Sequence, residues 1–120
     1  MMQILYVEDE VELAEAVMEV LSPMGYTFTH VIDGETAWQT LQTQSFHLLL
    51  TDLNLPNMTG LELIQKVRDS LPDIKIVGIS GFIEAEEIDR IKLLGADAIL
   101  LKPITPANLS SCLRAVAGQQ

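Results

Sequence analysis

Short apolar runs alternate with segments of helical periodicity along the whole sequence. Apolar residues spaced three or four positions apart follow each run. The runs occupy residues 4–7, 26–30, 47–51, 74–80 and 98–101. Runs as continuously apolar as Leu48-Leu49-Leu50 are typical of parallel strands that helices cover on both faces. We therefore predict an α/β fold, a single doubly wound, five-stranded parallel sheet of (βα)5 type.

The chain length and the positions of turn and cap residues favour one compact domain. The chain has 120 residues, 48% of them hydrophobic, which is enough for one sizeable core. Turn and cap residues such as Asp33-Gly34, Pro72 and Gly95 fall between the predicted elements. No linker, repeat or low-complexity tract interrupts them. We expect a single domain over residues 1–120.

The charge balance and the apolar runs exclude some partners. Seventeen acidic residues against seven basic ones give a formal net charge of −10, which would repel the phosphates of a nucleic acid. No positive segment precedes the first apolar run, and no run approaches the roughly 18 residues of a membrane helix. A single cysteine, Cys112, fits a reducing compartment. We expect a cytoplasmic chain that contacts neither nucleic acid nor membrane directly.

Polar residues gather at the carboxyl ends of the predicted strands. They are Glu8 and Asp9 after the first strand, Asp52 after the third, Ser80 after the fourth and Lys102 after the fifth. In the flavodoxin-like strand order 2-1-3-4-5, ligands bind between the ends of strands one and three, where the order reverses. The three carboxylates should therefore converge there.

Three neighbouring carboxylates would repel one another, so they should either take up a proton or bind a cation. Their ligand atoms are all oxygens, which favours a hard ion such as Mg²⁺, or Mn²⁺ in its place. His30 and His47 are isolated strand residues, and we assign them no metal or catalytic role. Each polar residue alone has an ordinary explanation in turn or cap chemistry, but five at four strand ends indicate a site.

Four segments carry a resemblance to a known family. They are Val7-Glu8-Asp9-Glu10, Leu50-Thr51-Asp52-Leu53-Asn54-Leu55-Pro56, Gly78-Ile79-Ser80-Gly81 and Leu101-Lys102-Pro103. Together they resemble the signature of response-regulator receiver domains, and the resemblance covers essentially the whole chain. It implies that Asp52 is the phosphoacceptor and that Glu8, Asp9, Asp52 and the backbone carbonyl of Asn54 hold the metal.

The same resemblance implies a switch and its partners. Ser80 and Lys102 would contact the phosphoryl group, and a cis bond before Pro103 would aim the ammonium of Lys102 into the pocket. The phosphoryl donor would be a sensor histidine kinase or a histidine phosphotransfer protein in a phosphorelay. The fourth helix, fifth strand and fifth helix would signal to a downstream effector or output domain.

Two positions depart from the family pattern. Ile99 stands where the family usually carries an aromatic residue that moves with the Ser or Thr. Gly81 follows Ser80 where a residue such as Ala is common, and glycine makes that loop more mobile. Asn54 and Phe82 should flank the phosphoryl group and influence its lifetime, Asn54 by orienting a water and Phe82 either as a lid or only by packing.

Two other functions share parts of this pattern. A haloacid-dehalogenase-type enzyme also attacks phosphate with an Asp after a parallel strand, but that family carries a second Asp two residues later, where this chain has Asn54. The acid/base group that turnover needs is thus missing. A pseudo-receiver, an interaction module that works without phosphorylation, is suggested by Ile99 but disfavoured by the complete acidic, Asp, Ser and Lys positions.

Overall fold

A computed structural model describes residues 2–81 and 83–118, and they form one parallel sheet with helices on both faces. The strand order is β2-β1-β3-β4-β5, and every neighbouring pair is parallel. The strands are β1 (Met2–Val7), β2 (Tyr26–Val31), β3 (Leu48–Asp52), β4 (Lys75–Ser80) and β5 (Ala98–Leu101). The predicted fold and strand order are confirmed.

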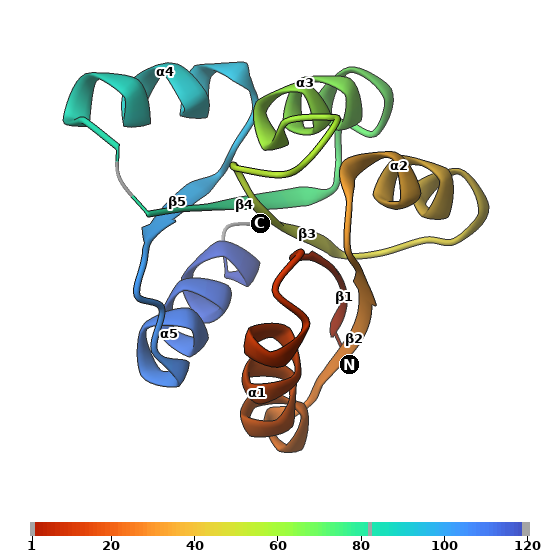
Figure 1. Cartoon of the computed structure of the whole chain (residues 1–120), viewed down its shortest axis with the longest axis vertical. Coiled ribbons are helices and arrows are strands. Elements are labelled where there is room, and N and C mark those ends of the chain that lie inside the picture. Colours follow the sequence, from red (N-terminus) through yellow and green to blue (C-terminus); the bar gives the residue numbers. More distant parts are fainter. Residues whose placement is uncertain (1, 82, 119–120) are drawn as a thin grey trace.

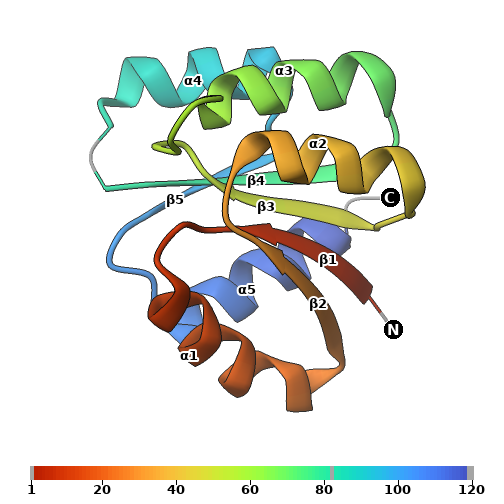
Figure 2. The same cartoon turned by 45° about the vertical axis from the view of Figure 1, so that its right-hand side comes forward.

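The helices divide into two layers (Figures 1 and 2). One hydrophobic cluster joins the sheet to α1 and α5, and a second joins it to α2, α3 and α4. The helices are α1 (Val11–Leu21), α2 (Gly34–Thr43), α3 (Gly60–Ser70), α4 (Ala85–Leu94) and α5 (Pro106–Ala117), with a short 3-10 turn at Ser22–Met24. Within residues 2–81 and 83–118, no helix has both the length and the apolar character needed to cross a bilayer.

Local chemistry sets the helix starts. Asp33, Thr59 and Thr105 each accept a hydrogen bond from a backbone N–H in the first turn of α2, α3 and α5, at distances of 2.7, 3.2 and 3.1 Å. Such N-caps satisfy donors that the helix itself leaves free. After α1 the chain turns at Gly25, whose φ of 101° lies in the left-handed region that favours glycine.

The centre of the sheet is its most buried part. All five residues of β3 are buried, as are the last four of β1, while β5 at the edge is only half-buried or exposed. The predicted bounds shift by one or two residues: β1 begins at Met2 instead of Ile4, and β3 ends at Asp52 instead of residue 51. Asp52 and Ser80 therefore lie within the paired parts of β3 and β4.

Candidate functional site

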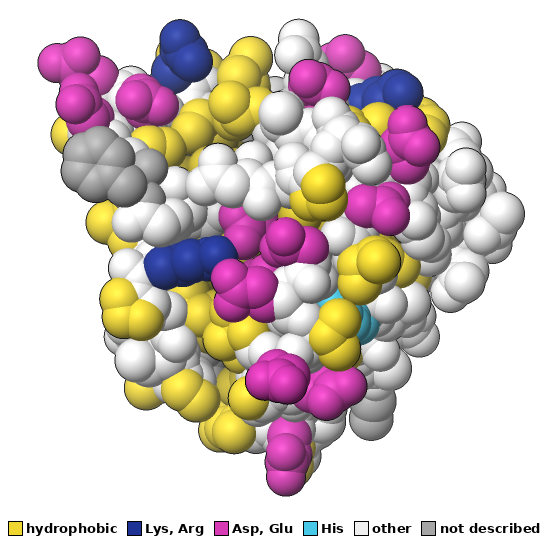
Figure 3. Space-filling model, in the orientation of Figure 1, with side chains coloured by type: hydrophobic (Ala, Val, Ile, Leu, Met, Phe, Trp, Pro, Cys, Tyr) yellow, Lys and Arg dark blue, Asp and Glu magenta, His cyan; other side chains and the backbone are white. Residues whose placement is uncertain are grey.

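The predicted carboxylates meet at the carboxyl edge of the sheet. Glu8 and Asp9 follow β1, Asp52 ends β3, and one carboxylate oxygen of each lies within 4.8 Å of the others. Figure 3 shows acidic side chains gathered beside a basic one near the middle of this face. All the grouped ligand atoms are oxygens, so the cluster fits a hard divalent cation such as Mg²⁺.

Asp52 is held on both of its oxygens. Its side chain is nearly inaccessible, with the residue 1% exposed. Oδ1 accepts a hydrogen bond from the backbone N–H of Asn54 at 2.8 Å, and Oδ2 accepts one from Nζ of Lys102 at 2.7 Å. A buried carboxylate needs such compensation, and the two bonds fix the direction in which it points.

Glu8 is completely buried beside it. Oε2 accepts a hydrogen bond from the backbone N–H of Glu10 at 3.1 Å, whereas Oε1 has no hydrogen-bond partner among the described residues. Burial raises the pKa of Glu8 from 4.5 to about 7, and the negative charge of Asp52 also raises it. The hydrogen bond from the Glu10 N–H lowers the pKa, but by less than these two effects raise it. Three carboxylates this close together disfavour one another's negative charge, which a bound cation would offset.

Lys102, which follows β5, connects the acidic cluster with Ser80 at the end of β4. Its backbone N–H donates to the carbonyl of Ser80 at 2.7 Å, and the Lys102-Pro103 peptide bond is cis. Burial lowers the pKa of Lys102, but the hydrogen bond and the charge of Asp52, with those of Glu8 and Glu10, outweigh this and leave the pKa raised. Lys102 therefore stays cationic at neutral pH.

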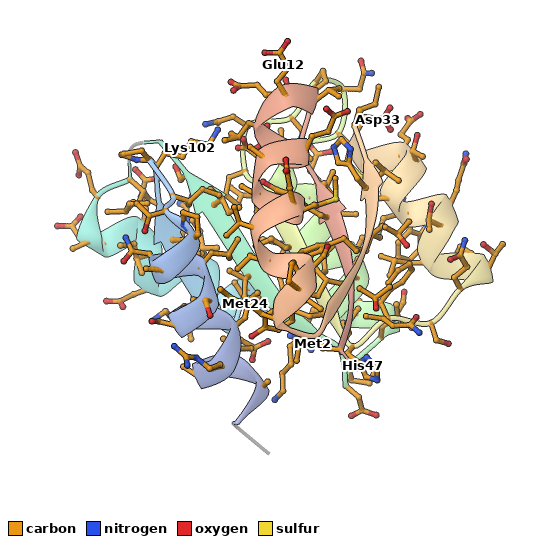
Figure 4. The ribbon with its side chains drawn as sticks, turned by 90° about the horizontal axis from the view of Figure 1, so that it is seen from below. Met2, Glu12, Met24, Asp33, His47 and Lys102 are labelled. Atoms are coloured by element: carbon orange, nitrogen blue, oxygen red, sulfur yellow. The ribbon has the colours of Figure 1, made fainter. Side chains whose placement is uncertain are left out.

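Two hollows lie at opposite ends of the sheet. One of about 330 Å³ opens beside the carboxylates and is lined by Glu10, Leu13, Lys102, Pro103 and Ile104. A larger one of about 680 Å³ is lined by residues that include Met2 and His47. Figure 4 shows Lys102 at the end of the molecule opposite Met2 and His47. The larger hollow is therefore remote from the chemistry of the carboxylates.

Comparison with known families identifies the group. The sequence matches the model of the family described as "Response regulator receiver domain" over residues 4–114. The chain belongs to this receiver family. The acidic cluster of Glu8, Asp9 and Asp52 is consistent with the phosphoacceptor site of a receiver domain in two-component signalling.

Individual relatives agree with this assignment. The receiver is 39% identical over 82 residues to the response regulator receiver protein CpdR of Brucella abortus, covering 68% of each chain. It is 38% identical over 119 residues to the response regulator RppA of Synechocystis sp., covering 96% of this chain but only half of RppA. The solved chemotaxis response regulator CheY4 of Vibrio cholerae superposes with a TM-score of 0.91 at 29% identity, covering 97% of this chain and 98% of that one.

The departures of this receiver from the family pattern can be placed in part. Ile99 is half-buried in β5 and packs against the core on the α2–α4 side, where its Cδ1 would lie 3.1 Å from a Cβ added at Gly78. Gly81 has open space around it. Ser80 is buried at the end of β4. Phe82 lies outside the described residues, so its predicted role at the phosphoryl group stays a prediction.

Sequence reasoning missed two residues of this receiver's site. Gly60, the first residue of α3, donates its N–H to the carbonyl of Leu53, and a Cβ there would clash with the carbonyl oxygen of Asp52. His30 was assigned no metal or catalytic role; its Nε2 lies 2.8 Å from the backbone carbonyl of Glu8, a contact that the sequence did not predict. The sequence around Gly60 and His30 does not indicate these contacts, because each contact depends on how closely two separate segments of the chain approach.

The raised pKa of Glu8 predicts a pH dependence of stability in the metal-free receiver. The folded pKa lies above the unfolded one, so the folded state keeps a proton that the unfolded state loses between about pH 4.5 and 7. We expect the free energy of unfolding to fall as the pH rises through this window, by on the order of 1–3 kcal/mol from Glu8 alone.

Urea unfolding with a chelator present would measure this effect, with Glu8→Gln as the matched variant. The variant cannot titrate at this position, so the wild type should lose more stability than the variant across the same window. Parallel pH profiles for the two proteins would contradict the prediction.

Proposed function

We propose that this receiver takes a phosphoryl group onto Asp52 from the phosphohistidine of a sensor histidine kinase or a histidine phosphotransfer protein, in a reaction that depends on Mg²⁺. One observation carries the proposal. The nearly inaccessible Asp52 carboxylate lies between Lys102 and the Asn54 N–H, with oxygens of Glu8 and Asp9 beside it. Glu8, Asp9, Asp52 and the backbone carbonyl of Asn54 would hold the metal.

The residues of the chain have defined tasks in this transfer. An oxygen of Asp52 attacks phosphorus, the P–N bond of the donor breaks, and a P–O bond to Asp52 forms. The ammonium of Lys102 offsets negative charge on the transferred group. A bound Mg²⁺ supplies further positive charge at the carboxylates and the phosphoryl oxygens. The burial of Asp52 excludes water until the donor presents its phosphoryl group.

The proposed switch runs from Asp52 to the edge of the sheet. The Ser80 hydroxyl would donate to a phosphoryl oxygen once that oxygen is present. Lys102 is already tied to Asp52 through its ammonium and to Ser80 through its backbone. A shift of Ser80 would therefore reach both the start of α4 and the end of β5. The α4–β5–α5 face is the proposed contact for an effector or output domain.

A pseudo-receiver is the second candidate. Receiver domains usually carry an aromatic residue at the position of Ile99, and its ring moves with the Ser or Thr; Ile99 has neither a ring nor a hydroxyl. Acetyl phosphate with and without Mg²⁺ separates the two functions. The phosphoacceptor function predicts a mass increase of one phosphoryl group that requires Mg²⁺ and is lost in alkali, as expected for an acyl phosphate. Unmodified protein under both conditions would favour the pseudo-receiver.

Asp9 is expected to contribute more to Mg²⁺ affinity than Glu8. Its side chain is shorter and exposed, whereas Glu8 is fully buried and already bonded to Glu10, so Asp9 is placed to ligate directly while Glu8 holds a metal-bound water. We predict that Asp9→Ala weakens Mg²⁺ binding about 100-fold and Glu8→Gln about tenfold.

Titrations followed by amide resonances would measure both affinities, with Glu12→Gln on the exposed face of α1 as the control. The ranking would be wrong if Asp9→Ala bound Mg²⁺ as tightly as the wild type, or if Glu8→Gln cost more than Asp9→Ala.

A further inference from the structure

Two buried side-chain atoms have no hydrogen-bond partner among the described residues, and both are on β1 or next to it. They are Oη of Tyr6 and Oε1 of Glu8, and both residues are 0% exposed. Buried polar atoms in folded proteins are almost always bonded to protein or to ordered water. Two such atoms, two residues apart, suggest one shared cause.

Tyr6 packs on the α1–α5 face of the sheet, next to His30. Side chains alternate along a strand, and Tyr6 packs into the cluster of α1 and α5 whereas Val7 packs into the opposite one. The Tyr6 ring lies 5.9 Å from the ring of His30, centroid to centroid. His30 in turn contacts the backbone carbonyl of Glu8. His30 therefore lies against both the Tyr6 ring and the backbone of Glu8.

A tyrosine hydroxyl can donate one hydrogen bond, and Tyr6 lies close enough to Glu8, Asp52 and Glu10 for their charges to act on it. Oε1 of Glu8 is an acceptor in need of a donor, because the Glu10 N–H bonds to Oε2. Donor and acceptor are complementary, although they do not bond directly.

We propose that Tyr6 is a positioning residue for Glu8, with its hydroxyl bonded to Oε1 through one buried water. The water would have two polar partners, the minimum that a buried water usually requires. The bridge would hold Oε1, while the Glu10 N–H holds Oε2, and the carboxylate would thereby be fixed beside Asp9 and Asp52. This inference rests on the proposed metal-dependent function, which it deepens by adding a residue behind the ligands.

Tyr6→Phe removes only the hydroxyl and keeps the ring, so the core stays filled. We expect it to weaken Mg²⁺ binding about threefold, which is less than the loss expected for Glu8→Gln. If Tyr6 acts through Glu8, adding Tyr6→Phe to Glu8→Gln should cause no further loss. Tyr26→Phe is the matched control, because Tyr26 begins β2 at the opposite end of the strands and is half-buried.

The proposal is overturned if Tyr6→Phe binds Mg²⁺ as the wild type does, or if its loss is equally large in the Glu8→Gln background. A merely structural role would lower the urea midpoint of Tyr6→Phe without changing Mg²⁺ affinity. A high-resolution crystal structure of the metal-free wild type gives a readout that needs no metal. Ordered water within about 3 Å of both oxygens supports the bridge, and its absence refutes it.

These two readouts separate the inference from the proposed function. If the wild type neither binds Mg²⁺ nor accepts a phosphoryl group, the proposed function fails, and the metal-free crystal structure still decides whether the bridge forms. If the wild type binds Mg²⁺ but shows no shared water and no effect of Tyr6→Phe, only the role of Tyr6 fails.

Discussion

Asp52→Asn is expected to reduce phosphoryl incorporation below detection. The amide keeps the size of the carboxylate and can still accept the hydrogen bond from the Asn54 N–H, which the carboxylate receives at 2.8 Å. It carries no negative charge, however, so it is a poor nucleophile toward phosphorus. Intact mass after incubation with acetyl phosphate and Mg²⁺ would measure the loss.

Asp69→Asn is the matched control, because Asp69 lies exposed near the end of α3 and should leave incorporation unchanged. Peptide mapping of any modified product would reveal slow transfer to a neighbouring hydroxyl such as that of Ser80. Incorporation into Asp52→Asn at the wild-type level would refute Asp52 as the phosphoacceptor.

Gly60→Ala is expected to destabilise the protein by about 3 kcal/mol or more. In a helix, replacing glycine with alanine normally stabilises the protein by about 1 kcal/mol. Helix propensity alone therefore predicts that Gly60→Ala is stabilising. Here the added Cβ would clash with the carbonyl oxygen of Asp52 and would lie 2.5 Å from Cα of Leu53. Both atoms belong to the backbone and cannot rotate away, so α3 or the end of β3 must move.

Urea unfolding followed by Trp38 fluorescence would measure this loss, because Trp38 is the single tryptophan and is half-buried in the α2–α4 core. Gly81→Ala is the control, since a Cβ at Gly81 would meet nothing within 4 Å. Because the clash is with Asp52 itself, Gly60→Ala should also accept phosphoryl groups more slowly than the wild type. An unchanged or higher unfolding free energy in Gly60→Ala would show that the helix can shift without cost.

The fold and the acidic cluster could be predicted from the sequence because both depend on patterns that each segment carries alone. Runs such as Leu48-Leu49-Leu50 specify strands buried on both faces, and helical spacing specifies the elements between them. In a parallel sheet all carboxyl ends lie at one edge, so Glu8, Asp9 and Asp52 had to be neighbours once the strand order was known.

Other features depended on the tertiary structure, because they arise where segments far apart in the chain approach one another. The guanidinium of Arg68 donates hydrogen bonds to the carbonyls of Gly95, Pro72 and Ile74 and to the carboxylate of Asp97. No pattern in the sequence predicts these bonds. The contact of Gly60 with Asp52 is of the same kind.

For Tyr6, the sequence predicts one feature and the tertiary structure decides another. Its alternation with Val7 predicts which face of β1 it occupies, but only packing against α1, α5 and His30 places its hydroxyl in a buried region without a partner. Local pattern therefore determined the elements and the edge at which the carboxylates meet. The close contacts that orient those carboxylates were decided by the register and packing of the whole sheet, because hydrogen-bond satisfaction and steric fit depend on distances of a few tenths of an ångström between distant residues.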